Sequence, residues 1–149
     1  MDVQEHYRRL EQLYYSANIQ RFYSNSQLTV SYEQAEIILP LDPAFHHGAH
    51  AVHGSVYFKL LDDAAYFAVA SLVQVEFIVT AAFQLNLLRP VTSGTLKAVG
   101  KVRSKSKSLF VAEATLYNEK GKEVAFGSGQ FMRTQQLLES LPGYHDNDA

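Results

Sequence analysis

One segment of the chain gathers several residue types that can do chemistry. Residues 46–73, HHGAHAVHGSVYFKLLDDAAYFAVASLV, begin as a loop rich in histidine and glycine and continue as a run that is apolar on nearly every helical face. A helix that is apolar all round belongs inside a core, and an ionised carboxylate there is costly unless it is paired or hydrogen-bonded. Asp62 and Asp63 therefore mark this segment as the place to look for a reaction centre.

Gly54 stands where this helix should begin, directly after His53. A helix N-terminus presents unpaired N–H groups and the positive end of a dipole, and a glycine lets a ligand approach the backbone. Such an amide can stabilise an oxyanion, although a plain helix entry would use the same two residues. Lys59 and Asp63 are spaced i, i+4 and predict a local ion pair. Asp62 has no such partner in the sequence and is the candidate catalytic carboxylate.

The histidines suggest a second kind of chemistry. His47, His50 and His53 recur at three-residue spacing, and zinc sites readily use imidazole. The glycine within the loop and the lack of a nearby carboxylate to complete a site argue against zinc, so we expect no metal. Hydrogen-bonding loop residues or substrate-positioning groups are the better interpretation.

A basic segment is the last candidate. Between Thr95 and Ala112 the sequence contains no acid and five cations, Lys97, Lys101, Arg103, Lys105 and Lys107. These could receive phosphate groups, or they could be a solvated strand edge and turn. Aromatic residues do not interleave with them as a stacking platform would require, which disfavours binding of single-stranded nucleic acid.

Composition limits the class of protein. A chain of 149 residues predicts one domain, and a net charge of −2 gives no bulk attraction to nucleic acid or to an anionic membrane. The absence of cysteine excludes disulfides and thiolate metal sites and fits a reducing compartment. No apolar signal segment opens the sequence, and no apolar run has the length of a membrane span. We therefore expect a cytoplasmic protein.

Hydrophobic periodicity supplies the elements that must position these residues. It predicts an amphipathic helix over residues 3–17, one extended stretch over 27–43, the buried helix after Gly54, and four consecutive antiparallel strands. In the first of these four strands the alternation predicts a single apolar face, with Thr80 on the opposite face. The apolar face consists of Val75, Phe77, Val79, Ala81, Phe83, Leu85 and Leu87. Such an order favours an α+β fold with one helix across one sheet.

These motifs together resemble the hotdog-fold acyl-CoA thioesterases of the PaaI-like type, in the 4-hydroxybenzoyl-CoA thioesterase superfamily. The similarity runs from about Leu39 to Thr134. Four stretches carry it: HGxxxxxLLDDAAYFAVAS at 53–71, the strand with Thr80, LRPVTSGTLKAVGKV at 88–102 and EKGKEVAFGSGQFM at 119–132. The resemblance implies an antiparallel sheet wrapped around one long central helix. We expect one such domain over 1–149, with an extra N-terminal helix in residues 1–20 and a tail over 135–149.

The resemblance also implies roles for individual residues. In such enzymes the glycine amide after the histidine polarises the thioester carbonyl, which points to Gly54 following His53. An acid nine residues after that histidine activates water or attacks as a nucleophile, which points to Asp62. A Ser or Thr on the next strand, here Thr80, helps to hold the water. An Asn six residues before the histidine often orients water or substrate, and His47 occupies its place.

Two positions depart from the motif of that family. Ser55 replaces the second glycine of His-Gly-Gly, and His47 replaces the Asn. Histidine can donate or accept a hydrogen bond, so the role could survive with a dependence on pH. The residues expected to bind substrate or CoA are Ser55, Arg103, Lys105, Ser106, Lys107 and Ser108.

The activity implied by the resemblance is hydrolysis of an acyl-CoA thioester to a free acid and CoA. Coenzyme A enters as part of the substrate, and no other cofactor is expected. The resemblance also implies a homodimer or homotetramer, with neither nucleic acid nor membrane as a partner. Two other activities stay open: a same-fold enoyl-thioester hydratase, and a non-catalytic acyl-CoA binding or regulatory module.

Overall fold

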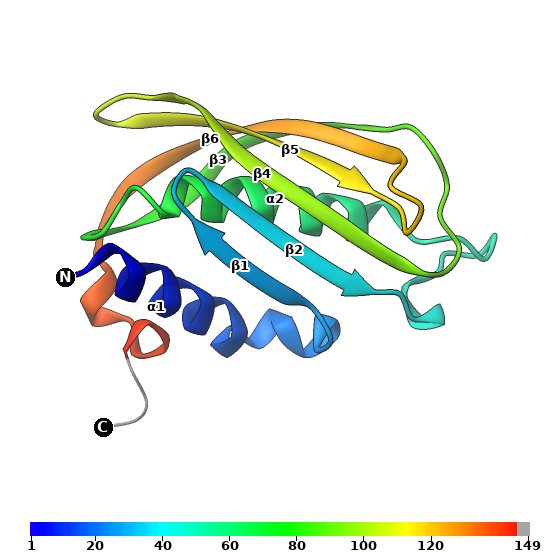
Figure 1. The fold of residues 1–149 in the computed structure, drawn as a ribbon, viewed down its shortest axis with the longest axis horizontal. Coiled ribbons are helices and arrows are strands. Elements are labelled where there is room, and N and C mark those ends of the chain that lie inside the picture. Colours follow the sequence, from blue (N-terminus) through cyan, green and yellow to red (C-terminus); the bar gives the residue numbers. More distant parts are fainter. Residues whose placement is uncertain (146–149) are drawn as a thin grey trace.

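The computed structural model describes residues 1–145, and the last four residues of the expected tail lie outside this range. Figure 1 shows the arrangement of the elements. In chain order they are α1 (Val3–Ser16), η1 (Asn18–Tyr23), β1 (Gln27–Ser31), β2 (Gln34–Pro40), η2 (Pro43–Phe45), α2 (Gly54–Ala70), β3 (Glu76–Leu87), β4 (Thr95–Lys105), β5 (Leu109–Tyr117), β6 (Glu123–Leu137), η3 (Leu138–Ser140) and η4 (Pro142–Tyr144).

The six strands form one antiparallel sheet in the order β1-β2-β4-β5-β6-β3. The sheet curves around α2, which packs along one of its faces (Figure 1). The helix and the sheet are in close contact at Gly100 of β4, where an added Cβ would lie 2.1 Å from the carbonyl oxygen of Ala64. Only glycine fits that distance. The α+β arrangement with one helix across one sheet is confirmed.

Helix α2 is buried over most of its surface, as its apolar sequence predicts. Leu61, Ala64, Ala65 and Ala68 are fully buried against the sheet. No Gly or Pro interrupts the run between Ser55 and Ala70, so helix propensity and burial favour the same structure.

The prediction of one extended stretch over residues 27–43 is wrong in one respect, because these residues form a hairpin of two strands. β1 and β2 pair antiparallel, with Ser31 opposite Gln34. The turn carries none of the glycine, asparagine or proline residues that usually mark one. Glu33 takes the left-handed conformation at φ 55°, and its N–H donates a hydrogen bond to Ser71 Oγ at 2.9 Å. A hydrogen bond to the end of α2 thus stabilises a turn that the local sequence does not predict.

The single apolar face expected for β3 is also wrong. The pairing of β3 with β6 shifts register between Thr80 and Ala82, as at a β-bulge, and such a bulge exchanges the two faces of a strand. Before the bulge Ile78 is buried while Val79 is 41% exposed. After it, Phe83 and Leu85 pack against the core. Thr80 consequently lies on the face that meets α2.

The amphipathic helix expected over residues 3–17 is α1, whose Tyr7, Leu10 and Tyr14 are buried. His6 is fully buried and ties this helix to the rest of the fold. Its Nε2 lies 2.8 Å from the carbonyl oxygen of Ala70 and its Nδ1 lies 2.7 Å from Tyr144 Oη. The carbonyl can only accept, so Nε2 carries a proton. Within the described residues, no helix has both the length and the apolar character that crossing a bilayer requires.

Candidate active site

A cleft of about 530 Å³ opens between the N-terminal part of the chain and the start of β3, with α2 between them. Asp62 and Thr80, which the family resemblance assigns to one site, both line it. The rest of its wall is mostly apolar and aromatic, which is typical of sites for small organic ligands. The lining residues are Leu13, Tyr14, Ala17, Ile19, Gln20, Lys59, Asp62, Asp63, Tyr66, Phe67, Phe77, Ile78, Val79, Thr80 and Leu141.

Asp62 has the electrostatics of a working acid–base group. Thr80 Oγ1 donates a hydrogen bond to Asp62 Oδ1 at 2.9 Å. Burial is the main cause that raises the pKa of Asp62 to about 6; the negative charge of Asp63 adds to it, while the Thr80 hydrogen bond and the Lys59 ammonium oppose it. The carboxylate is therefore ionised at neutral pH but much more basic than an ordinary aspartate.

The expected ion pair between Lys59 and Asp63 is present on the same helix. Lys59 Nζ also lies over the rings of Tyr14 and Tyr23, at 5.2 and 5.0 Å from their centroids. Burial raises the pKa of Asp63, and the Lys59 charge and a hydrogen bond from Gln20 oppose that shift. The pair is therefore engaged with the N-terminal segment, and Asp62 is the carboxylate left for chemistry.

Gly54 is the first residue of α2, as expected, and His53 is its N-cap. His53 Nδ1 accepts a hydrogen bond from the Ser55 N–H at 3.0 Å and lies 2.8 Å from Ser55 Oγ. The Val56 N–H donates to the His53 carbonyl oxygen at 3.0 Å. Helix geometry gives the Gly54 amide no acceptor within the helix. It is thus the first-turn amide available to a ligand.

His47 lies beside Gly54, in a second pocket of about 240 Å³. The Ala49 N–H donates to His47 Nδ1 at 3.0 Å, so a neutral His47 carries its proton on Nε2. The His47 and His53 rings contact each other with centroids 6.5 Å apart. Among residues 1–145, no group of three or more possible ligands could hold a metal ion.

The two halves of the expected site lie apart on one chain. Asp62 follows Gly54 by eight residues, which places them about 12 Å apart along the helix axis. They line different pockets, Asp62 with Thr80 and Gly54 with His47. A single thioester carbonyl cannot meet the amide and the carboxylate of the same copy.

The basic segment over residues 103–108 lies at the end of β4 and in its turn to β5. Two acids offset part of its charge: Arg103 Nε lies 3.1 Å from Oε1 of Glu113 on β5, and Lys105 pairs with Glu33 of the β1–β2 turn. Ser106 Oγ donates to the carbonyl oxygen of Leu109 at 2.7 Å, so it closes the turn. Ser108 is exposed beside it.

Arg133 connects this turn to the start of β3. Its Nε donates to the carbonyl oxygen of Lys107 at 2.9 Å and its Nη1 lies 2.9 Å from Glu76 Oε2. Because Phe77 and the residues after it line the Asp62 cleft, the turn stands beside one end of that cleft. Within the described residues, the Lys107 ammonium has no ion-pair partner.

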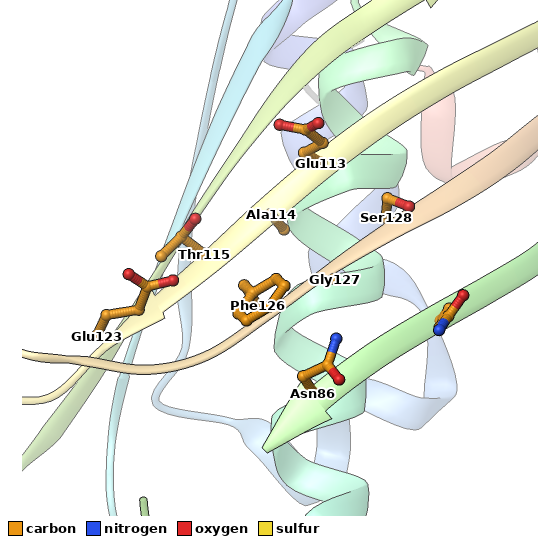
Figure 2. A pocket seen from close by; sticks show the side chains of 9 residues that line it. Asn86, Glu113, Ala114, Thr115, Glu123, Phe126, Gly127 and Ser128 are labelled. Carbon is orange, nitrogen blue, oxygen red and sulfur yellow. The ribbon is translucent and has the colours of Figure 1, made fainter. Parts of the chain in front are cut away.

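A further pocket, of about 400 Å³, lies on the face of the sheet turned away from α2 (Figure 2). It is lined by Glu113, Glu123, Ser128 and Asn86. The two acids lie apart along the strands, because Glu113 is opposite Ser128 and Glu123 is opposite Tyr117. Both acids are exposed, and Glu113 is already bonded to Arg103. Solvated carboxylates are weak bases, which makes this pocket a poorer candidate than the Asp62 cleft.

Two parts of the cleft have no counterpart in the sequence prediction. The segment NIQRFYSNSQ over residues 18–27 is polar and loop-like in sequence, yet Ile19 and Gln20 line the cleft. Leu141 reaches it from beyond β6. Nothing in the local sequence of these residues signals a site. Tyr66, which shares one side of the helical wheel with Asp62, also lines the cleft and donates to the carbonyl oxygen of Ile78 at 2.6 Å.

Comparison with known sequences gives two matches. A sequence model described as the thioesterase superfamily matches residues 49–125, which include Gly54, Asp62 and Thr80. A protein of Saccharolobus solfataricus with a provisional esterase name is 34% identical over 67 residues. That match covers 45% of this chain and 45% of the relative, so it spans less than half the length of that protein.

Solved structures resemble the whole fold. The PaaI protein from the phenylacetic acid degradation operon of E. coli superposes with a TM-score of 0.81 at 22% identity, covering 91% of this chain and 97% of that chain. A thioesterase from Haemophilus influenzae gives a TM-score of 0.75 at 19% identity, covering 86% of this chain and 90% of that chain. At such identities the likeness establishes the fold and not the substrate.

Proposed function

The chain belongs to the thioesterase superfamily and has the hotdog fold of its structural neighbours, and on that premise we propose that it hydrolyses an acyl-CoA thioester to a free acid and CoA. Among the described residues, the observation that carries this proposal is the carboxylate of Asp62 beside the Thr80 hydroxyl in an apolar cleft. A base near neutrality combines a useful ionised fraction with a useful driving force for proton transfer. A pKa of about 6 for Asp62 meets that need.

In the proposed reaction Asp62 acts as a general base on water. Thr80 occupies Oδ1, which leaves Oδ2 to accept a proton from the attacking water. The water oxygen bonds to the thioester carbon, the C–S bond breaks, and the proton is passed on to the departing CoA thiolate. Direct attack by Asp62 is the alternative, and single turnover in ¹⁸O-labelled water separates the two routes. General-base catalysis puts the label into the first acid released. Attack by Asp62 forms a mixed anhydride, and when water opens it at the Asp62 carbonyl the first acid carries an unlabelled Asp62 oxygen while the label stays on Asp62.

The oxyanion donor in this proposal is the Gly54 amide of a second copy of the chain. The separation of about 12 Å between Gly54 and Asp62 along α2 excludes their joint action within one copy. β3 is an edge strand of the sheet, so two copies can pair antiparallel through it. Such a homodimer brings the helix start of one copy toward Asp62 of the other, with His47 beside the amide. A homotetramer of two such pairs is equally compatible with this site.

We assign the phosphates of CoA to residues 103–108, at the turn beside the cleft. Lys107 is the cation of this turn without an ion-pair partner in the described part of the chain, so it is the free point charge for a phosphate. We expect Lys107→Glu to raise KM for acyl-CoA severalfold and to leave kcat within about twofold, because a phosphate contact binds ground and transition states alike. Lys120→Glu, in the turn before β6, is the matched control. Equal KM values in the two variants would remove Lys107 from the CoA site.

Release of free thiol from a panel of acyl-CoA esters tests the proposed activity. We expect turnover by the wild type and a loss of about 10²–10⁴ in kcat for Asp62→Asn, with Glu123→Gln, an acid on the outer sheet face (Figure 2), unchanged. Hydration of an enoyl-CoA without thiol release would identify a hydratase instead. Tight binding of acyl-CoA with no turnover of any ester would identify a binding module. Equal turnover by wild type and Asp62→Asn would contradict the role of Asp62.

A further inference from the structure

The N-terminal part of the chain forms one wall of the Asp62 cleft. Leu13 and Tyr14 belong to the last turns of α1, and Ala17, Ile19 and Gln20 follow it. We call residues 13–20 the N-terminal arm. Strand β3 forms the facing wall, and Asp62 lies on α2 between the two. Any group that extends from a thioester at Asp62 into this cleft must pass along the arm.

The arm is fixed by contacts with α2 that the reaction itself does not need. Tyr14 is 2% exposed, its ring meets Phe67 edge-on at 5.6 Å, and its hydroxyl donates to Ser26 Oγ at 2.8 Å. Lys59 places its ammonium over the Tyr14 ring. Such a cation is attracted by the electron-rich ring face.

Asp63 is the second residue that holds the arm on α2, and we call the Lys59–Asp63 pair the anchor of the arm. Its carboxylate accepts from Lys59 and from Gln20 of the arm. A partly buried ion pair that contacts a neighbouring segment on two sides defines the position of that segment more than it adds to stability. Lys59 and Asp63 therefore act on the cleft through the arm.

The chemistry of the arm indicates what it contacts. Leu13, Ala17 and Ile19 present only hydrocarbon side chains to the cleft. Three apolar residues of β3 also line it, Phe77, Ile78 and Val79. The polar groups of the cleft lie on α2, at Thr80 and at Gln20 of the arm, and Gln20 is turned to Asp63 of α2. The space beyond Asp62 thus suits an alkyl chain and offers little to an acetyl group, which ends before it reaches the arm.

We propose that the N-terminal arm selects the acyl group, favouring extended apolar chains over acetyl, and that the Lys59–Asp63 pair is the positioning device that holds the arm at the cleft. This inference rests on the proposed hydrolysis at Asp62 and adds the substrate class to it. A substitution at Ala17 should change the preferred acyl chain length, because Ala17 is exposed and lines the cleft.

Filling the cleft from the arm tests the selection. Ala17→Phe adds a ring in the path of the chain, so kcat/KM for decanoyl-CoA falls by about tenfold or more while the value for acetyl-CoA stays within about twofold. Asn18→Phe is the matched control, because Asn18 is the next exposed residue and does not line the cleft. Equal losses for both esters in Ala17→Phe, or the same loss in Asn18→Phe, would overturn the role of the arm. A wild type that prefers acetyl-CoA would also overturn it.

A separate double variant tests whether the Lys59–Asp63 pair positions the arm. In Lys59→Met/Asp63→Asn both charges are removed together, which avoids leaving one buried charge unpaired. Both charges also act on the pKa of Asp62, in opposite directions, and that effect is common to all esters. We therefore expect the ratio of kcat/KM for decanoyl-CoA to kcat/KM for acetyl-CoA to fall severalfold, and Lys59→Arg to retain the wild-type preference. A uniform fall in kcat for both esters, with no change in the preference, would show that the pair does not position the arm.

Binding separates a failure of this inference from a failure of the proposed function. A thioether analogue of decanoyl-CoA cannot be hydrolysed, and calorimetry measures its Kd whether or not the protein is an enzyme. The arm predicts that Ala17→Phe weakens this Kd by about tenfold and that Asn18→Phe does not. If thiol release fails while this difference is found, the proposed hydrolysis is wrong and the arm still selects chains. Equal Kd values for wild type and Ala17→Phe would overturn the inference.

Discussion

Asp62 can serve as a base because of what surrounds it and not because of its type. An exposed aspartate titrates near pH 4 and holds too little affinity for a proton to draw one from water. In the cleft, burial raises the pKa of Asp62 to about 6, and the neighbouring Asp63 charge adds to this shift. Thr80 limits the rise by donating to Oδ1. The balance leaves the group ionised and basic at neutral pH.

The pKa of Asp62 predicts the pH dependence of the reaction. In the proposed reaction the ionised form of Asp62 is the active one, so kcat/KM should rise with pH, reach half its maximum at about pH 6 and level off above it. Thr80→Val removes the hydrogen bond that lowers this pKa, so its midpoint should lie higher than that of the wild type. Thr80→Ser keeps a hydroxyl and is the control. A midpoint near pH 4, or one that does not move in Thr80→Val, would contradict this assignment.

Unfolding gives a readout of the same group that does not involve activity. Folding raises the pKa of Asp62, so its contribution to stability is present in full below about pH 4, the value for an unfolded chain, and is lost as pH rises through the folded value. Thermal unfolding of Asp62→Asn should therefore show a higher Tm than wild type at pH 8 and little difference at pH 4. A destabilised variant at pH 8 would show that the carboxylate supports the fold.

At the residue scale the sequence predicts groups that lie on one element and misses contacts between distant ones. The i, i+4 spacing predicts the Lys59–Asp63 pair, which is confirmed. The contact of Lys59 with Tyr14 and Tyr23 is not predictable in this way, because these residues lie more than one element away. No local pattern reports which ring a lysine will meet after the chain has folded back.

At the scale of elements, the start of α2 is the second part of the proposed site. His53 caps the helix through the Ser55 N–H, so Gly54 is left with the amide that has no acceptor inside the helix. An added Cβ at Gly54 would lie 3.2 Å from Leu87 Cδ1, a flexible side chain that can move aside. The role of Gly54 is thus separable into its amide and its small size.

Two substitutions at Gly54 make that separation. Proline is accepted at the first position of a helix, and the extended backbone of His53, at φ −63° and ψ 142°, suits a following proline. Gly54→Pro therefore deletes the N–H with little change to the helix and should lower kcat by about 10²–10³. Gly54→Ala keeps the N–H and should lose much less. Equal losses in both variants would show that space, and not the amide, matters at this position.

The elements themselves were predictable wherever one kind of periodicity runs unbroken. α1 and α2 show a sustained helical pattern, and both are confirmed. The β1–β2 turn was missed because Glu33 reaches its left-handed conformation through a contact with Ser71, and nothing at the turn signals it. The faces of β3 were wrong because a bulge after Thr80 exchanges them. Both errors arise where tertiary contacts override a local pattern.

At the scale of the whole molecule, the two edges of the sheet differ in whether another element covers them. α1 covers β1: Arg8 Nη2 donates to the carbonyl oxygen of Val30 at 3.1 Å, and the Val30 N–H donates to Glu11 Oε2 at 2.8 Å. β3, the other edge, pairs only with β6 in the described part of the chain. An edge left open along a strand of 12 residues is suited to a second copy. The sequence showed the motif residues but not their separation into two pockets.

Mixing two inactive variants tests this account most directly, because it requires Asp62 of one copy and Gly54 of another at one thioester. Asp62→Asn and Gly54→Pro chains, each inactive alone, are unfolded and refolded together. Random pairing makes half of the dimers mixed, and each mixed dimer has one intact site, so thiol release should recover to about one quarter of the wild-type rate. Recovery to that level is the predicted result. No recovery from a mixture that forms dimers would contradict the shared site.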